Sequence, residues 1–485
     1  MSQSVSQSAS ATPPAASKSS GWLTAVMPVV TIAACTELGI SVLGNSALPV
    51  YFTKGLHIPT HVMGYLLIWF YISESLFKSP LGVLADRIGR KPLIVGGAAV
   101  TIFTPILLIS VHYDPVQVTS FAVLVAFGFL RALDGLGQAA MWPSLYAYVG
   151  DVVEENKRGA AMGAMNVVYM LGTAFAFLAG GFADDSFGPW LTKQETFGDA
   201  LHRVGHSIHQ GGRHLVSHLH HHARAAGSLA PAAPVVPPSH QPEYYYPSFY
   251  LASILFALAV IAALALKGRK PEAPAAGSAE GAGESITRSQ FIDALKTVPQ
   301  FLGIAFVTFL GIGCIVPIMK LFVLAQFHVT ETEFGILVLG PALVIAAIAL
   351  PAGQLADRWG KARSVRLGFT LCATGLVAIC GLYFLHTGKF EFLAAATVLG
   401  IGFMIAFPAW LALLTVLGGE HQRGTIFAAV STAQGLGALA GVALGTQTYD
   451  SIGHIAPFVA AAGFVTLGTI LVLIFVRDTR LRLPV

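Results

Sequence analysis

The chain contains the stretch Gly82-Val-Leu-Ala-Asp-Arg-Ile-Gly-Arg-Lys-Pro92, and a later stretch repeats it. Gly353-Gln-Leu-Ala-Asp-Arg-Trp-Gly-Lys361 follows the same pattern, 271 residues further on. Each copy is a short charged turn between two long apolar stretches. The same turn at the same place in two halves is typical of a duplicated membrane protein.

The composition supports a membrane protein. Hydrophobic residues make up 55% of the chain, charged residues only 11%, and the mean hydropathy is +0.70. A soluble protein normally carries about 25% charged residues. The four cysteines all fall in apolar runs without metal-ligand spacing, so we interpret them as small core residues.

Apolar runs of membrane-spanning length fill most of the chain, at about 20 residues per crossing. They predict twelve transmembrane helices, at about 22–52, 61–81, 93–112, 118–148, 159–181, 247–266, 299–327, 333–352, 365–386, 392–417, 424–447 and 455–476. The predicted fold is therefore an all-α integral membrane protein of two six-helix bundles. Residues 1–20 form a predicted disordered cytoplasmic tail, 21–266 the N-terminal bundle, 267–298 a cytoplasmic linker and 299–485 the C-terminal bundle.

The positively charged residues predict the orientation. With the amino terminus in the cytoplasm, 19 of the 28 Lys and Arg residues lie inside, 6 lie outside and 3 fall within spans. This is the sense that the positive-inside rule requires. We therefore expect a multi-pass protein of the plasma (inner) membrane, with both termini cytoplasmic.

Further positions relate the two halves. Gly64 and Gly335 share the offset of 271 residues. Pro143 precedes Arg158 by 15 residues, and Pro408 precedes Arg423 by the same distance. The pattern predicts parallel repeats of six helices each.

One long loop breaks this symmetry. Residues 182–246 form a predicted extracytoplasmic loop that is rich in histidine, and its first part, about 197–219, has helical apolar spacing. His214, His218 and His222 are spaced as metal ligands on a helix, but no carboxylate or cysteine joins them at ligand spacing. We therefore predict no specific metal site, and we expect deletion of about 196–236 to leave transport largely intact.

At these motifs the chain resembles the major facilitator superfamily over nearly its whole length. Gly82–Pro92 fits that family's signature between helices 2 and 3, and Arg131-Ala-Leu-Asp-Gly-Leu-Gly137 fits its helix-4 signature, which is closest to the twelve-helix drug:proton antiporters. The helix-5 stretch Ala176–Gly181 keeps the paired glycines of those antiporters but lacks their proline. The resemblance implies a cytoplasmic gate formed by Gly82, Asp86, Arg87, Gly89 and Arg90, with Asp357 and Arg358 from the second copy.

Ionisable residues within spans need a reason, because an ionised side chain at mid-bilayer costs at least about 2.5–3.5 kcal/mol on insertion scales. This chain has Glu37, Glu74, Lys78, Arg131, Asp134 and Lys320 in predicted spans. Lys320 lies near the outer mouth of helix 7, where it could snorkel to the interface. We name Glu37, Arg131, Asp134 and Glu74 as candidate proton and substrate coupling residues.

Glu37 is the leading candidate. Ser41 and Asn45 follow it at i+4 and i+8, so a polar stripe runs along one helix face, which should line an aqueous cavity. A carboxyl group in a poorly solvated cavity can take up a proton near neutral pH, which suits a proton carrier. Glu74 with Lys78, and Asp134 with Arg131, are local pairs that could equally be structural.

These features predict a proton-coupled exporter of small apolar or amphipathic organic compounds that works by alternating access. Two alternatives stay open: proton-coupled uptake of a small metabolite such as a sugar or organic acid, and a metal-binding or metal-exporting protein that uses the His-rich loop. The expected cavity wall is Asn45, Phe403, Phe407, Trp410, Phe427 and Gln434.

No sequence motif indicates an enzyme, a cofactor or nucleic-acid binding, and no Walker motif indicates ATP-driven transport. The expected partners are a small-molecule substrate, protons and the lipid bilayer, and we expect a monomer.

Overall fold

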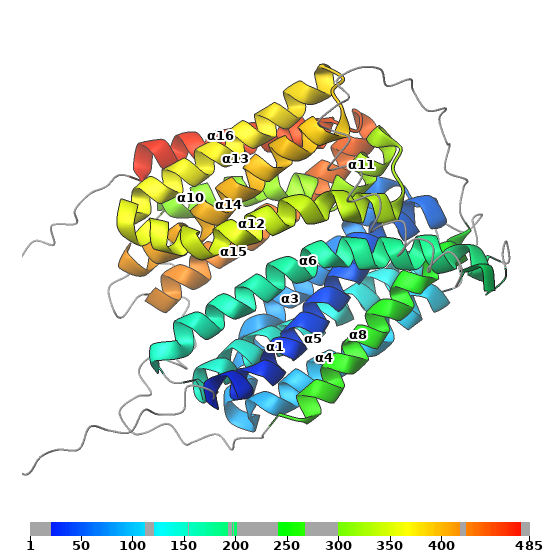
Figure 1. The fold of residues 1–485 in the computed structure, drawn as a ribbon, viewed down its shortest axis with the longest axis horizontal. Coiled ribbons are helices and arrows are strands. Elements are labelled where there is room, and N and C mark those ends of the chain that lie inside the picture. The colour runs from blue at the N-terminus through cyan, green and yellow to red at the C-terminus, as the bar shows by residue number, and fades with distance from the viewer. Residues whose placement is uncertain are drawn as a thin grey trace, which may run out of the picture.

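The computed structural model describes residues 21–111, 121–153, 155–192, 196, 198–200, 241–266, 299–417 and 423–476. In the first half, the long helices are α1 (Gly21–Ser41), α3 (Thr60–Ile88), α4 (Arg90–Ser110), α5 (Phe121–Val152), α6 (Glu155–Leu191) and α8 (Tyr246–Leu264). In the second half they are α10 (Pro299–Ile315), α12 (Glu331–Trp359), α13 (Lys361–Phe384), α14 (Lys389–Leu417), α15 (Arg423–Ser451) and α16 (Ala456–Phe475). The described residues contain no strand, and Figure 1 shows the helices in two bundles, one for each half.

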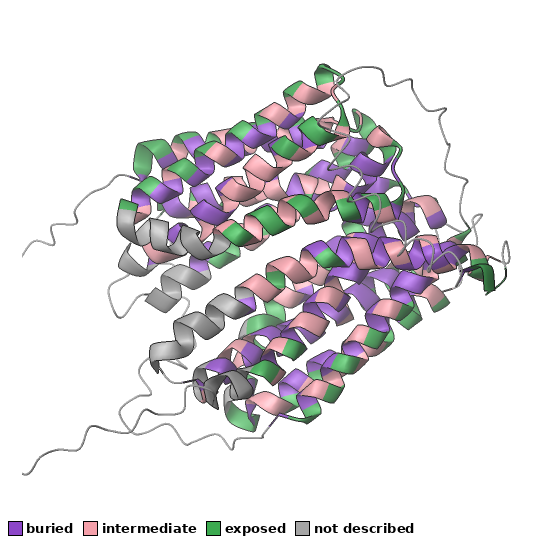
Figure 2. Cartoon of the chain, in the orientation of Figure 1, coloured by how far each residue is buried: buried purple, intermediate pink, exposed green. Residues whose placement is uncertain are grey.

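The predicted all-α membrane fold is confirmed, but the count of twelve spans stays a prediction. Within the described residues, nine helical segments are long and apolar enough to cross a membrane, and the bent pair α10 and α11 (Met319–Phe327) would make a tenth. The helices α3 and α15 are each 29 residues long but fall outside that set. Large apolar side chains such as Phe103, Phe129 and Ile261 remain exposed on the bundle surfaces, as lipid-facing residues do (Figure 2).

Two spans are less regular than predicted. The first continues from α1 through a π-helical turn (Val42–Ala47), the short α2 (Leu48–Val50) and a second π-helical turn (Tyr51–Gly55). The seventh was predicted as one helix over 299–327, but α10 and α11 are separated by a break and bent by 42°. Pro317 lies in the break, and proline cannot donate the backbone hydrogen bond that a continuous helix needs.

The charged turns are shorter than predicted. The helix α3 continues to Ile88 and α4 begins at Arg90, so Gly89 alone joins them, with a φ of 99°. Gly360 joins α12 and α13 in the same way, with a φ of 98°. Glycine adopts positive φ without steric cost, so the repeat places a glycine where each half turns.

The helix before the long loop also extends further than predicted. It was expected to end near 181, but α6 continues to Leu191. The loop's predicted amphipathic segment at about 197–219 lies mostly outside the described residues, as do its histidines from 201 to 240, the tail 1–20 and the linker 267–298.

The two bundles meet at one end of the molecule. The helices α6 and α12 pack together, as do α3 and α15. We call the end that holds the start of α3 and the end of α15 the His61 end, and the opposite end, with Gly89 and Gly360, the Gly89 end. Towards the Gly89 end the ribbons of α6 and α12 diverge (Figure 1), and Leu76, Phe77 and Leu343 are exposed on α3 and α12.

Glycines allow the close approach at the His61 end. A Cβ atom on Gly335 of α12 would lie 2.3 Å from the Cα of Leu178 on α6. A Cβ atom on Gly64 of α3 would lie 2.2 Å from the Oγ1 of Thr446 on α15. The two glycines that the repeat relates therefore lie at the two crossings between the bundles.

Candidate functional site

A cavity of about 550 Å³ lies between the two bundles. The N-terminal bundle supplies most of its lining, from α1, α3, α5 and α6, and the second half supplies residues at the α10–α11 break and on α15. The lining includes Glu37, Ser41, Asn45, Phe70, Tyr71, Glu74, Lys78, Arg131, Gln138, Trp142, Tyr146, Tyr169, Val316, Pro317 and Val442. The wall is thus mainly aromatic, with a few polar and charged groups, as in many sites for organic ligands.

Glu37 is almost fully buried at this cavity, with 2% of its surface exposed. Its Oε1 atom accepts hydrogen bonds from Ser41 Oγ at 2.9 Å and from Thr173 Oγ1 at 2.8 Å. Asn45 Nδ2 donates to Ser41 Oγ at 3.3 Å, so the polar stripe of α1 forms one hydrogen-bonded chain. A Cβ atom on Gly172 would lie 2.9 Å from Glu37 Cγ, and this glycine therefore lets α6 approach the carboxylate.

The other predicted coupling residues form two ion pairs. Arg131 and Asp134 are 3% and 0% exposed, and Arg131 Nη1 donates to Asp134 Oδ2 at 2.5 Å. Asp134 also accepts a short hydrogen bond from Thr104, and the Arg131 guanidinium lies 4.8 Å from the centre of the Phe70 ring. Lys78 Nζ donates to Glu74 Oε1 at 2.8 Å.

Glu37 differs from these carboxylates. It lines the cavity, yet no salt bridge joins it to a cation within the described part of the chain. The structure therefore brings Glu37, Arg131 and Glu74 to the wall of one cavity, with Asp134 bound behind Arg131.

The expected cavity wall is divided between two pockets. Asn45 lines the cavity with Glu37, whereas Phe403, Phe407, Trp410 and Gln434 line a second pocket of about 300 Å³ inside the C-terminal bundle. The rings of Phe403 and Phe407 are stacked there, 5.3 Å apart. The side chain of Phe427 lies outside the described part of the structure.

The residues of the predicted gate lie at the Gly89 end. Gly82 has no atom within 4 Å of where a Cβ would be, Arg87 is exposed and Arg90 is partly exposed. The backbone is helical at Asp86, Asp357 and Arg358, but their side chains are outside the described residues. The gating role assigned to these residues thus stays a prediction.

Lys320 does not snorkel, contrary to expectation. It is 2% exposed, and its Nζ donates to the backbone oxygen of Ser46 at 2.9 Å, to Ser46 Oγ at 3.0 Å and to Glu331 Oε2 at 2.6 Å. Ser46 belongs to the first half and Lys320 and Glu331 to the second, so this cluster joins the two bundles. Burial against a carboxylate is an alternative to snorkelling for a lysine near a helix end.

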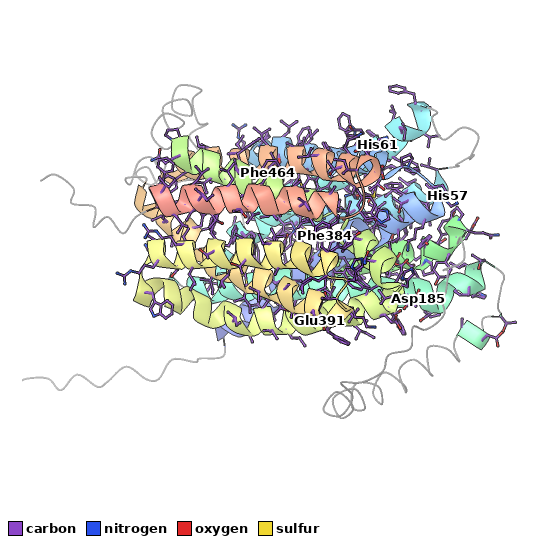
Figure 3. The ribbon with its side chains drawn as sticks, turned by 90° about the horizontal axis from the view of Figure 1, so that it is seen from above. His57, His61, Asp185, Phe384, Glu391 and Phe464 are labelled. Carbon is purple, nitrogen blue, oxygen red and sulfur yellow. The ribbon has the colours of Figure 1, made fainter. Side chains whose placement is uncertain are left out.

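Sequence reasoning missed further contacts at the His61 end. The backbone N–H of Thr332 on α12 donates to Asp185 Oδ2 on α6 at 2.8 Å. His61 Nδ1 lies 2.8 Å from Asp450 Oδ2, and the backbone N–H of His61 donates to the same oxygen. Figure 3 shows His61 and Asp185 at the same end of the molecule. No signal in the sequence marks these pairs, because their members are 147 and 389 residues apart.

The family profile described as Major Facilitator Superfamily matches residues 29–192 and 301–484, one segment in each half. Similar curated proteins include "Multidrug resistance protein 2" of Bacillus subtilis (30% identical over 132 residues), the "Inner membrane transport protein YajR" of Escherichia coli (32% over 136) and the "Quinolone resistance protein NorA" of Staphylococcus aureus (25% over 176). These matches cover 27%, 27% and 36% of this chain and only 30%, 27% and 44% of those proteins.

Two solved structures share the fold over most of the chain. The nucleoside transporter NupG superposes with a TM-score of 0.67 at 11% identity, over 93% of this chain and 99% of that one. The human organic anion transporter MFSD10 superposes with a TM-score of 0.56 at 14% identity, over the same shares.

Proposed function

The chain belongs to the major facilitator superfamily, and from this premise we propose that it exports small apolar or amphipathic organic compounds in exchange for protons. Members of this family are integral, multi-pass membrane transporters rather than enzymes. The proposed location is the inner membrane, with both termini in the cytoplasm and the His61 end outside. The proposed unit is a monomer.

The observation that carries the proposal is the state of Glu37. It is a buried carboxylate at the wall of the central cavity, held by two hydroxyl groups and joined to no cation among the described residues. A carboxylate in such a place is stable when protonated and costly when ionised, unless a cationic ligand or water approaches it. Proton binding and substrate binding at one carboxylate would then exclude each other, which is the requirement for exchange.

The arrangement of the bundles supports alternating access. The inter-bundle contacts of Ser46, Lys320, Asp185 and Thr332 close the His61 end, whereas the exposed faces of α3 and α12 diverge towards the Gly89 end. Rocking of one bundle against the other would open the His61 end and bring the charged stretches Gly82–Pro92 and Gly353–Lys361 together. Gly82, Asp86, Arg87, Gly89, Arg90, Asp357 and Arg358 are the proposed gate at that end.

Uptake of a small metabolite is the second candidate. The helix-5 stretch Ala176–Gly181 lacks the proline of the drug:proton antiporters, and this favours uptake. Similarity to multidrug resistance proteins favours export. A metal-handling function has less support, because no group of three or more His, Cys, Asp and Glu residues could hold a metal within the described ranges, which omit 201–240.

Transport in inverted and right-side-out vesicles with an imposed pH gradient distinguishes these functions. The export proposal predicts that inverted vesicles with an acidic lumen accumulate a lipophilic dye, and that dissipating the gradient with a protonophore stops accumulation. Accumulation of a sugar or organic acid by right-side-out vesicles, with no dye transport, would establish uptake instead. Transport of metals alone, lost on deletion of 196–236, would establish the third function.

A further inference from the structure

Gln138 on α5 is a buried amide at the wall of the central cavity. It is 3% exposed and lines the cavity with Glu37. Neither its Nε2 nor its Oε1 atom has a hydrogen-bond partner in the described protein. A buried amide without a partner is costly, and most buried polar side chains in native proteins are bonded. The unmade bonds therefore point to a ligand that makes them.

An aromatic surface lies next to this amide. Trp142 follows Gln138 by four residues on α5, so both side chains lie on one helix face about one turn apart. The Trp142 ring lies 5.7 Å from the ring of Tyr146 and 5.9 Å from the ring of Tyr169, between centroids. All three rings line the same cavity. A planar ligand packed against these rings would present its edge to the Gln138 amide.

We propose that Gln138 is a specificity-determining residue that selects planar aromatic substrates with a cis-amide edge, in which an N–H group adjoins a C=O group. The amide oxygen of Gln138 accepts from the ligand N–H, and its NH2 group donates to the ligand carbonyl. This pairing satisfies both atoms at once, which a ligand with only a donor or only an acceptor cannot do. The inference rests on the proposed function, because it names the substrates that the transporter would carry.

The amide selects by hydrogen bonding, whereas Glu37 responds to charge and protons. The two residues lie on different helices, α5 and α1, and no hydrogen bond links them among the described residues. Loss of the Gln138 amide should therefore alter which compounds bind without removing the carboxylate. This separation allows selectivity to be measured without a pH gradient.

Oxindole and N-methyloxindole are suitable probes. Both are planar and bicyclic, but methylation removes the N–H donor from the cis-amide edge. Binding is measured by quenching of tryptophan fluorescence in the full-length protein in lipid nanodiscs. The wild type should bind oxindole about tenfold more tightly, as expected for a site whose amide oxygen would otherwise lose its partner. Gln138→Met, which keeps the side-chain length without polar atoms, should bind the two probes within about twofold of each other.

Two further variants control this test. Gln300→Met changes an exposed glutamine at the start of α10, outside the cavity, and should keep the tenfold preference. Gln138→Asn retains both amide atoms on a shorter chain, and should keep part of the preference, so the test remains possible even if the methionine variant does not fold.

The thermal midpoint separates recognition from a structural role. Because the amide has no partner in the described protein, Gln138→Met should not lower the midpoint of the unliganded transporter. The proposal is overturned if the wild type does not bind oxindole or does not prefer it. It is also overturned if Gln138→Met keeps the preference, or if that variant loses stability and weakens both probes equally. Since no arm uses transport, failure of proton-driven export would not be confused with failure of this inference.

Discussion

Glu37 is separated from the other membrane carboxylates by its partners. Glu74 and Asp134 each contact a basic side chain of their own helix, at 2.8 Å and 2.5 Å, whereas Glu37 contacts Ser41 and Thr173. A neighbouring cation stabilises the ionised form of a carboxylate, and hydroxyl donors do so less strongly. Of the carboxylates in the described spans, Glu37 is therefore the one we expect to exchange its proton most readily.

Glu37→Gln should separate coupling from binding. The amide mimics the protonated carboxyl group, so we expect gradient-driven accumulation to fall to background while downhill exchange continues and no longer depends on pH. Paired assays in vesicles, with and without a pH gradient, measure both properties. Glu74→Gln is the matched control and should reduce accumulation by less, because its carboxylate already has Lys78 as a partner. Normal accumulation by Glu37→Gln would place coupling elsewhere, and Asp134 would be the next residue to test.

At the scale of helices, the crossing of α6 and α12 depends on one hydrogen atom. Gly335→Ala would put a methyl group about 2.3 Å from the Cα of Leu178, so the helices must separate, at a typical overpacking cost of about 1–3 kcal/mol. We expect this variant to favour the form that is open at the His61 end. Reaction of a cysteine introduced at Ile40, in the cavity, with an impermeant thiol reagent added outside should then increase.

Gly340→Ala provides the control on the same helix. No atom lies within 4 Å of where its Cβ would be, and alanine favours helix, so accessibility should stay at the wild-type level. Equal effects of the two alanine variants would show that a general change in α12, rather than the crossing at Leu178, is responsible.

The charged stretch at the end of α3 carries a prediction of its own. Asp86→Asn should reduce transport while leaving expression and substrate binding nearly normal, because the carboxylate is expected to hold the bundles together at the Gly89 end. Asp357→Asn should reduce transport less, because its copy departs further from the family pattern. Transport rates and equilibrium binding of one substrate measure both. A larger effect of Asp357→Asn would move the gate to the second half.

The sequence predicted the elements that arise from local chemistry. Apolar runs marked the helices, and the repeated glycines at 89 and 360 marked the two turns, because positive φ is a property of single residues. The same period related Gly64 to Gly335, although their role at the crossings became clear only in the structure. Helix ends were placed less well, since α3 and α12 continue through most of their charged stretches.

Long-range contacts were not predictable in this way. Lys320 looked like a snorkelling lysine because its partner Ser46 lies 274 residues away. The aromatic residues Phe403, Phe407 and Trp410 were expected at the substrate cavity, but they lie together in the pocket of the C-terminal bundle. Helical spacing reports which residues share a face, not which neighbour that face meets.

At the scale of the whole molecule, two groups of polar contacts hold the His61 end closed, and their burial differs. The side chains of His61 and Asp450 are 35% and 27% exposed, whereas those of Lys320 and Glu331 are 1% and 8% exposed. Exposed ion pairs contribute about 0–1 kcal/mol, while removal of one partner of a buried pair costs about 3–5 kcal/mol. The buried cluster with Ser46 should therefore dominate the equilibrium between the two forms of the transporter.

Glu331→Gln should open the His61 end far more than Asp450→Asn does. The first variant leaves Lys320 without its carboxylate while it is buried between the bundles, and separation of the bundles lets water reach the ammonium group. The second removes a partly exposed contact, for which we expect less than about a fivefold change in accessibility. Reaction of the cysteine at Ile40 with external reagent measures both. Combining Glu331→Gln with Lys320→Met should restore much of the closure, because no buried charge then remains. A larger effect from Asp450→Asn, or no recovery in the double variant, would show that this buried pair does not control access.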